Sequence, residues 1–443
     1  MKFTKLGKAL LMSALSVGLI LGISSCVQSY TVGYLYVTGT KTAQSGNNGI
    51  ISGFRIDHNT GFLRSIHQFP VSSGGSNPVR AILLPGSRFV YVLNRGVNAQ
   101  GNSDCSGASG DTVCQNANIT QFSVGGNGIL TYQATFFTQG FNPFRLAVDS
   151  IGGHLLALDH DAPDPAACQL ALGPNVANCA DVTVFNVDST TGRLSLVTNA
   201  QVTSASGKPL TYFPVPSNPI DFVMAQSFLL TLTGTPAQGD SVFPYIFGAS
   251  GQLTLSQNSA QPLGIKQATA IVNAAGTIYV LDNESPVSNP NSAAQILPFT
   301  VGTGGALQAQ PVGVIPDEPS VSDPIYLIQE SKNSKFIYIA NRKGNPQAAP
   351  PVPSGGIAGY SITNSPTLAY TPTVPGFFGT GANPQCLVED PSNQYIYTAN
   401  FDDSSVTGRL VDPNAGVLNS MRKGSKWALE GPATWCLVNG RTD

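Results

Sequence analysis

Phe89-Val90-Tyr91-Val92, an aromatic and β-branched strand that follows Asn77-Pro78 and a tight turn, decides the fold because the chain repeats it. Six further copies of this strand lie at 34–37, 154–157, 228–231, 277–280, 336–339 and 395–398. A repeat of roughly fixed period predicts a radial architecture, in which each unit buries its apolar face only against its neighbours.

Each repeat carries the signals of four strands. The first strand follows Asn-Pro or a similar pair, the second is the strand quoted above, and the third alternates polar and apolar residues, as in 119–124. A turn such as Asp188-Ser189-Thr190-Thr191-Gly192 leads to the fourth, since Gly supplies positive φ and Asp caps the turn. The opening pairs lie at 77–78, 142–143, 218–219, 323–324, 383–384 and 431–432, while the fourth repeat lacks the proline and begins near 264–265.

The first and last repeats are incomplete in a complementary way. The first strand of the last repeat, 433–438, stands alone at the C-terminus. The three strands that would complete its blade are 32–38, 50–56 and 63–69 at the N-terminus. Pairing the two chain ends would leave no sheet edge open. The sequence therefore predicts an all-β protein: one seven-bladed β-propeller over 32–440, with four-stranded antiparallel blades, closed by its N- and C-terminal strands.

Composition agrees with this fold and excludes some functions. Charged residues are only 10% of the chain, with 47 Gly and 32 Pro, as expected for many short strands and turns. The net charge is −2 and no basic run follows the N-terminus, so we expect no nucleic-acid partner. Asp159, Asp161 and Asp164 fit no calcium-loop spacing, and no cofactor or metal motif is found, so we expect none.

The N-terminus has the three parts of an export signal. Lys2, Lys5 and Lys8 precede an apolar stretch over 9–23, too short for a membrane span, and Ile23-Ser24-Ser25-Cys26 follows. This end resembles a bacterial lipobox, which implies that 1–25 is a lipoprotein signal peptide, that Cys26 is acylated, and that 26–31 links the anchor to the propeller. An ordinary signal peptide with a chance cysteine is the alternative. We expect an exported protein, lipid-anchored in the bacterial cell envelope.

Six cysteines remain after Cys26, as expected in an oxidising compartment. The repeat map places Cys105 with Cys114, and Cys168 with Cys179, each pair within one loop between second and third strands. The last two, Cys386 and Cys436, fall on the innermost strands of neighbouring blades, so we predict three disulfides.

Loop lengths predict two unlike faces. Turns joining strands one to two and three to four are tight, whereas loops joining strands two to three and the links between blades are long, as at 95–117 and 160–180. In an antiparallel blade the long connections emerge on one face, here called the decorated face, and the tight one-to-two turns on the other, the plain face. Ligand-binding residues concentrate on loops held by a rigid scaffold, although neutral insertions would give the same pattern. The N-terminal strand should begin at the plain face.

Aligned first strands suggest a charged level near the channel mouth. Arg80, Arg145 and Asp221 share one level in consecutive blades, and Lys266, Tyr326 and Cys386 fall near it in the next three. Guanidinium groups there would bind a carboxylate or a sugar. The alternative is ion pairing between blades. Trp427 and Trp435 are expected to be packing residues.

The repeat resembles one family. The phrase Asn59-Thr60-Gly61-Phe62-Leu63, followed by Asn77-Pro78 and Tyr91-Val92-Leu93-Asn94, is similar to the seven-bladed lactonases of the 6-phosphogluconolactonase and carboxymuconate-cyclising kind. Asn383-Pro384 with Tyr397-Thr398-Ala399-Asn400 repeats it. The resemblance covers nearly all of 32–440 and implies the propeller fold and, for enzymes of the family, lactone hydrolysis.

One departure bears on that activity. The resemblance implies a Pro-His-x-His motif on one inner strand of the family's enzymes. This chain has Pro143-Phe144-Arg145-Leu146 at that place, and all four of its histidines lie outside the expected inner strands. We therefore predict a binding or interaction scaffold whose ligand face is made of long loops, acting as a monomer on a small-molecule ligand or an envelope protein. A hydrolase of sugar lactones is the alternative, and a structural module of an envelope complex is a third possibility.

The lipobox interpretation predicts that Cys26→Ser abolishes incorporation of labelled palmitate when the chain is expressed in a bacterial host. The matched change Ser25→Ala keeps a small residue before the cysteine and should keep the label. Metabolic labelling and membrane fractionation measure both effects. Equal labelling of the two variants would show that Cys26 is not the acylated residue.

Overall fold

The structure is a computed structural model that describes residues 30–41, 48–86, 88–102, 105, 112–204, 206–235, 237–256, 260–345, 354–364 and 367–440. The expected signal peptide, Cys26 and most of the linker 26–31 lie outside the described residues. Among those described, no helix combines the length and hydrophobicity needed to cross a bilayer.

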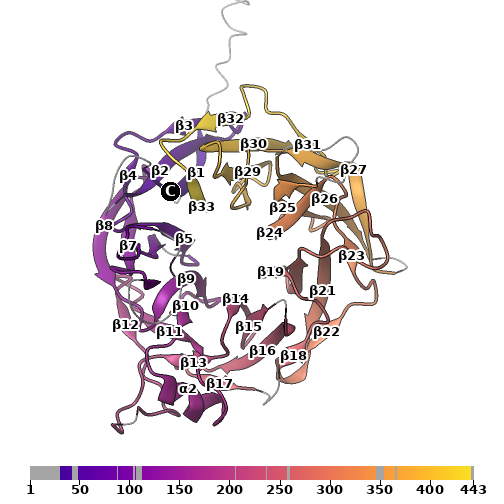
Figure 1. The fold of residues 1–443 in the computed structure, drawn as a ribbon. Helices are drawn as coiled ribbons and strands as arrows, with labels where there is room; N and C mark the ends of the chain where they lie inside the picture. The colour runs from indigo at the N-terminus through magenta and orange to yellow at the C-terminus, as the bar shows by residue number, and fades with distance from the viewer. Residues whose placement is uncertain are drawn as a thin grey trace, which may run out of the picture.

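Seven antiparallel sheets surround a central axis, as predicted (Figure 1). Blade one contains β5 (Pro78–Leu83), β6 (Phe89–Asn94), β7 (Asn118–Val124) and β8 (Leu130–Phe136). Blade two contains β9 (Phe141–Val148), β10 (His154–Asp161), β11 (Ala180–Val187), β12 (Leu194–Leu196) and β13 (Phe213–Val215). Blade three contains β14 (Pro219–Ala225), β15 (Phe228–Thr235), β16 (Gly239–Phe247), β17 (Leu253–Leu255) and β18 (Gln261–Pro262).

The ring continues through three similar sheets. Blade four contains β19 (Ala268–Ala274), β20 (Thr277–Asp282), β21 (Gln295–Val301), β22 (Leu307–Ala309) and β23 (Ile315–Pro316). Blade five contains β24 (Val321–Gln329), β25 (Phe336–Gly344), β26 (Gly356–Thr363) and β27 (Ala369–Gly379). Blade six contains β28 (Val388–Glu389), β29 (Tyr395–Asn400), β30 (Ser405–Val411), β31 (Leu418–Asn419) and β32 (Lys426–Ala428).

Blade seven is built from both ends of the propeller, as predicted. It contains β33 (Ala433–Gly440), β1 (Thr31–Thr40), β2 (Gly49–Asp57), β3 (Leu63–Ser65) and β4 (Val71–Ser72). The strands β1 and β33 pair antiparallel, with Val37 opposite Cys436 and Leu35 opposite Val438. In five of the seven blades two short segments share the outermost position, as β3 and β4 do beside β2, so each blade remains four strands wide.

The Asn-Pro signal has a backbone cause. Asn77, Asn142, Asn218, Asp323 and Asn383 all have φ between 52° and 60°, a region that Asn and Asp tolerate better than most residues. A register shift in the pairing of the inner strand follows the first four of these residues, as between Pro78 and Arg80. The pair therefore turns the chain from the blade link into the inner strand.

Neighbouring blades are joined through the turn glycines. The Tyr36, Tyr338 and Tyr397 hydroxyls donate to the carbonyls of Gly128, Gly416 and Gly61 in the following blade, at 2.7, 2.9 and 2.6 Å, and Tyr91 donates likewise to Gly192. The aromatic ring two residues earlier covers the same glycine: a Cβ on Gly192 would lie 2.6 Å from Phe89. These glycines thus serve the next blade as well as their own turn.

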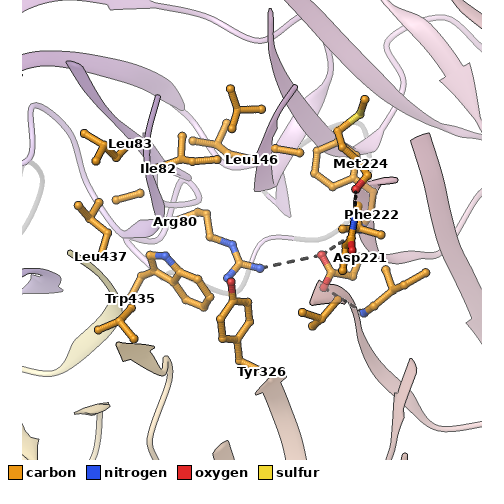
Figure 2. Close-up of a pocket in the computed structure, with 18 of the residues that line it drawn as sticks. Arg80, Ile82, Leu83, Leu146, Asp221, Phe222, Met224, Tyr326, Trp435 and Leu437 are labelled. Carbon is orange, nitrogen blue, oxygen red and sulfur yellow. Dashed lines mark hydrogen bonds and ion pairs between the residues drawn. The ribbon is translucent and has the colours of Figure 1, made fainter. Parts of the chain in front are cut away.

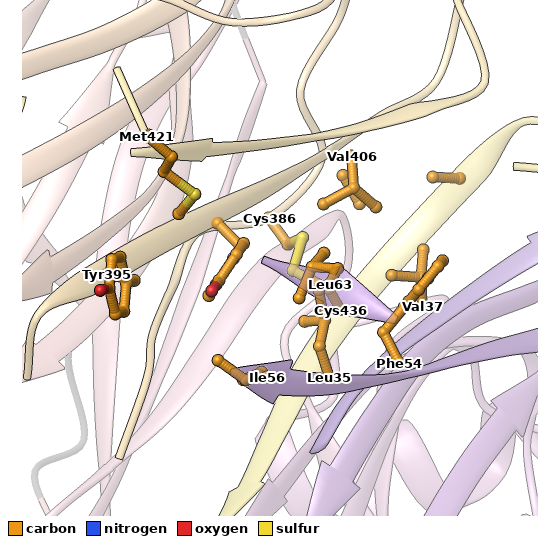
Figure 3. Packing of buried hydrophobic residues seen from close by; sticks show 13 residues of the cluster. Leu35, Val37, Phe54, Ile56, Leu63, Cys386, Tyr395, Val406, Met421 and Cys436 are labelled. Atoms are coloured by element: carbon orange, nitrogen blue, oxygen red, sulfur yellow. A yellow bond between two sulfur atoms is a disulfide. The ribbon is translucent and has the colours of Figure 1, made fainter. Parts of the chain in front are cut away.

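Apolar side chains fill the spaces between blades. Leu35, Val37, Ile56 and Leu63 of blade seven pack against Tyr395, Val406 and Met421 of blade six (Figure 3). The Cys386–Cys436 disulfide lies inside this cluster, and Cys105–Cys114 and Cys168–Cys179 also form, so all three predicted pairs are confirmed. The pair Cys386–Cys436 connects the closing blade to its neighbour through a buried bridge.

The loop between β10 and β11 contains a helix that the sequence did not predict. The helix α2 (Pro165–Leu172) begins with the Asp164 side chain accepting a hydrogen bond from the Ala166 N–H at 2.9 Å. Proline at the first helical position suits this start, because its missing N–H would be unpaired there. A 3₁₀ turn, η2 (Thr303–Gly305), lies between β21 and β22. Helical structure thus stays minor in a β-propeller.

The contact between blades predicts unequal costs for two similar substitutions. Gly192 and Gly86 have φ of +65° and +63°, so alanine should cost about 1–2 kcal/mol at either position for its conformation alone. At Gly86 the new Cβ meets no described atom within 4 Å, whereas at Gly192 it collides with Phe89. We expect Gly192→Ala to destabilise by roughly 1–3 kcal/mol more than Gly86→Ala, measured by denaturant unfolding. Equal losses would mean that the turn alone requires Gly192.

Candidate functional site

Three consecutive inner strands bring a charged cluster to the axis. Arg80 comes from β5 and Asp221 from β14 (Figure 2), and Arg145 comes from β9 between them. The Asp221 Oδ1 atom lies 3.1 Å from Arg145 Nε and 3.9 Å from Arg80 Nη2. Asp221 and Arg80 are well buried, with 7% and 12% of their side chains exposed, and Arg145 is more open at 27%.

The Asp221 carboxylate is occupied by partners within the protein. Its Oδ1 accepts from Arg145 Nε and from the Phe222 N–H at 2.9 Å, while Oδ2 accepts from the Ile271 N–H at 3.4 Å. A carboxylate held by backbone donors of two adjacent blades is an anchor for the cluster.

Arg80 is in a different state. Its guanidinium carbon lies 3.6 Å from the centre of the Trp435 ring, a cation–π contact, but it donates no hydrogen bond to another residue in the described part of the chain. Burial and the nearby Arg145 lower the pKa of Arg80 to about 10, so it stays charged at neutral pH. The Tyr326 ring meets Trp435 edge-on at 5.1 Å, and burial raises the pKa of its hydroxyl. Arg80 therefore has donors to offer in a largely dry setting.

The strand register shows which sequence candidates share this level. Arg80, Arg145, Asp221 and Tyr326 each lie just past the register shift of their inner strand, so the structure brings these four together. Lys266 does not belong with them: it precedes β19, is exposed, and its backbone N–H donates to Glu284. The residue past the shift in β19 is Ala270. Blade four lacks the Asn-Pro signal, which is why the count from sequence missed by four residues.

Trp435 packs against the clusters on both sides of blade seven, as predicted for a packing residue, and it also lines the channel because it lies just past the shift in β33. In blades one, two, three and five the channel residue is the second residue after the proline. Two residues after Pro432 is Thr434 rather than Trp435, because the Gly431-Pro432 pair precedes β33. Trp427 does pack, edge-on against Phe62 at 5.7 Å. The signal that could have found Trp435 is its place beside Cys436 in the closing strand.

Two cavities meet at the charged cluster. The larger, about 590 Å³, has Arg80, Asp221, Tyr326 and Trp435 in its lining, together with one-to-two turn residues such as Ser150, so it opens at the plain face. The smaller, about 240 Å³, is lined by Arg80, Arg145, Arg342 and Trp435 and opens at the decorated face. Arg80 and Trp435 line both cavities. The layer that they form divides the central channel into a plain-face chamber and a decorated-face chamber.

Candidate general bases lie away from this layer. The His160 Nδ1 and Asp161 Oδ2 atoms are 3.0 Å apart beside a separate cavity of about 610 Å³ near α2, and the His160 ring approaches the Phe144 ring at 6.3 Å. Although burial opposes it, hydrogen bonds from His160 and Asn142 lower the pKa of Asp161. Burial also raises the pKa of Asp159 and Asp181, but neither side chain reaches the surface. His160 is thus the accessible base nearest to Arg145 along the chain.

Within the described ranges, no group of three or more His, Cys, Asp or Glu side chains is placed to hold a metal ion. Asp164, one of the three acidic residues considered for calcium, caps α2 instead. Asp159 faces Asp181 across the strand pair β10–β11, and Asp161 binds His160 and Asn142. The three carboxylates therefore have separate structural partners.

The fold is shared with known structures. No protein-family model and no curated protein matches the chain. Its solved neighbours are lactonase-like seven-bladed propellers. A provisionally assigned 6-phosphogluconolactonase from Bacteroides fragilis has a TM-score of 0.63 at 14% identity, over 92% of this chain and 98% of its own. The periplasmic gluconolactonase of Pseudomonas aeruginosa has a TM-score of 0.60 at 16% identity, over 93% and 100%. At these identities the likeness establishes the architecture, which confirms the resemblance found in the sequence.

Proposed function

We propose that the central channel binds an organic carboxylate, with Arg80 and Arg145 as its charged partners. One observation carries this proposal. Two guanidinium groups surround one carboxylate, Asp221, which leaves one surplus positive charge in the cluster, and Arg80 reaches Asp221 only as an ion pair at 3.9 Å, without a hydrogen bond among the described residues.

A buried cation that shares its only counter-ion with a second cation is incompletely compensated, so an anion that completes the cluster would be bound favourably. Arginine suits this role because its planar fork of donors matches both oxygens of a carboxylate. The Trp435 ring restricts the plane of the Arg80 guanidinium, and the Tyr326 hydroxyl, protonated at neutral pH, is a further donor near the same layer. These residues stand on strands rather than loops, so the site is held rigidly before any ligand arrives.

The residues at the family's histidine positions favour binding over proton transfer. Phe144 and Leu146 stand there, and the Phe144 ring lies 5.1 Å from the Arg145 guanidinium carbon. An aromatic ring beside arginine orients it but transfers no proton. Three disulfides and a periplasmic fold neighbour support an extracytoplasmic protein, in which a lipid anchor at Cys26 would keep such a binder at the membrane.

Trp435 offers a direct test of binding. The chain has two tryptophans, so Trp427→Phe leaves Trp435 as the only one. In this background we expect at least one of gluconate, benzoate and octanoate to change Trp435 fluorescence saturably. Arg80→Gln should weaken that binding roughly 10–100-fold, because charge-assisted hydrogen bonds are lost.

Two variants serve as controls for this titration. Arg64→Gln removes an exposed arginine on β3 and should leave binding unchanged. Arg145→Gln, at a more open position, repeats the test if Arg80→Gln fails to fold. Unchanged affinity in both channel variants, or no response to any carboxylate, would overturn the proposal.

Lactone hydrolysis is a second candidate, favoured by the lactonase names of the fold neighbours. Water would add to the ring carbonyl, the ring C–O bond would break, and the ring oxygen would take a proton to become a hydroxyl group. The hydroxy acid so formed would ionise to its carboxylate and one proton. The arginine pair that binds a carboxylate could also stabilise the oxyanion formed on the way. His160, oriented by Asp161, is the residue that could take the proton from water.

Proton release from glucono-1,5-lactone, followed by pH-stat, separates the two candidates. On the binding proposal we expect the rate with the protein to equal the buffer rate, because the carboxylate beside Arg80 and Arg145, that of Asp221, is held by Arg145 and by two backbone N–H groups. Catalytic turnover that Arg145→Ala abolishes would replace the binding proposal by the hydrolase. Loss of the same turnover in His160→Asn would assign the base.

A further inference from the structure

The plain-face chamber differs from the decorated-face chamber in the chemistry of its walls. Its wall is formed by six inner strands, whose residues there are mostly aliphatic or aromatic, among them Ile82, Leu83, Leu146, Phe222, Met224 and Leu437 (Figure 2). Polar side chains occur at its two ends only. Ser150, Gln226 and Asn273 lie at the mouth, and Arg80, Asp221 and Tyr326 lie at the floor.

This distribution restricts what can fill the chamber. Few polar side chains stand along this wall to replace the hydrogen bonds to water that a polyhydroxylated sugar acid would lose there. An aliphatic or aryl chain gains from the same wall by leaving water. The volume of about 590 Å³ lies within the range of small-molecule sites, whereas the decorated-face chamber, at about 240 Å³, is below it.

We propose that the ligand is an amphipathic monocarboxylate, with its carboxylate on Arg80 at the floor and its apolar body along the plain-face chamber. This inference rests on the proposed function and adds the ligand's class and its direction in the channel. The Arg80–Asp221–Arg145 cluster, of which Arg145 lies on the decorated-face side of the floor, carries one surplus positive charge, which matches one carboxylate. Asp221 shares this floor, so a second acidic group there would meet repulsion.

Access to the chamber agrees with this class of ligand. The end of β33 that carries Val438 borders the plain-face chamber, and Gly33 of β1 pairs with Gly440 at that end. The propeller's first strand thus begins on the face where the chamber opens. A lipid anchor a few residues before Thr31 would hold this mouth close to a bilayer, where amphipathic acids partition.

A series of acids of increasing length tests the inference in the Trp427→Phe chain. We expect affinity for butanoate, hexanoate and octanoate to rise about fourfold for each added methylene that enters the chamber. Octanol, which has the tail without the charge, should bind more weakly than octanoate, and gluconate more weakly than hexanoate. Affinity independent of length, or tighter binding of gluconate than of hexanoate, would overturn this inference while the carboxylate site stands. No response to any acid would overturn the proposed function as well.

Two matched substitutions locate the tail. Met224→Gln places a polar side chain of similar size in the plain-face chamber and should reduce octanoate affinity several-fold while leaving butanoate nearly unchanged. Phe401→Gln makes the same kind of change in the decorated-face chamber and should leave both affinities unchanged. If Phe401→Gln weakens octanoate and Met224→Gln does not, the body of the ligand lies toward the decorated face and the inference is wrong.

Discussion

The antiparallel pairing of β1 with β33 is the constraint on which the molecule depends. It joins residues some 400 positions apart in one sheet and leaves no blade edge open at the seam. The same pairing carries Cys436 to Cys386 and turns Trp435 toward Arg80. Without it, the channel would lack the aromatic side of its charged layer, and blade seven would have no inner strand.

Two local features of the sequence repeat around the ring and fix the position of each blade. An Asn or Asp in the left-handed region stands near the start of four of the inner strands, and the shift that follows sets which side chain reaches the axis. Aromatic side chains of one blade then pack on the turn glycine of the next, so the spacing between blades repeats. Each feature uses only two or three residues. Their repetition makes a frame stiff enough to hold two arginines near one carboxylate.

Sequence reasoning located much of the site because that frame is regular. Counting from the Asn-Pro pairs was enough to align Arg80, Arg145, Asp221 and Tyr326, and the structure brings them to one level. The count failed where the signal is absent or displaced. Lys266 stands outside the channel because blade four has no Asn-Pro pair. Trp435 packs as predicted, but its second place in the channel lining was missed because no partner aromatic pattern surrounds it in the sequence. The larger chamber was also unexpected on the plain face, since loop length indicates where chain is inserted and not where side chains leave space.

The sequence by itself determined the strand pattern, the number of blades, the closure and the three disulfides, because each of these follows from periodicity and from residues close to their partners within the repeat. Only the tertiary structure decided that Asp221 is already satisfied, that Arg80 is left with free donors, and that an apolar chamber stands beside it. These properties depend on distances between side chains of different blades and on the space that the inner strands leave between them. Neither quantity is encoded in the order of residues along one strand.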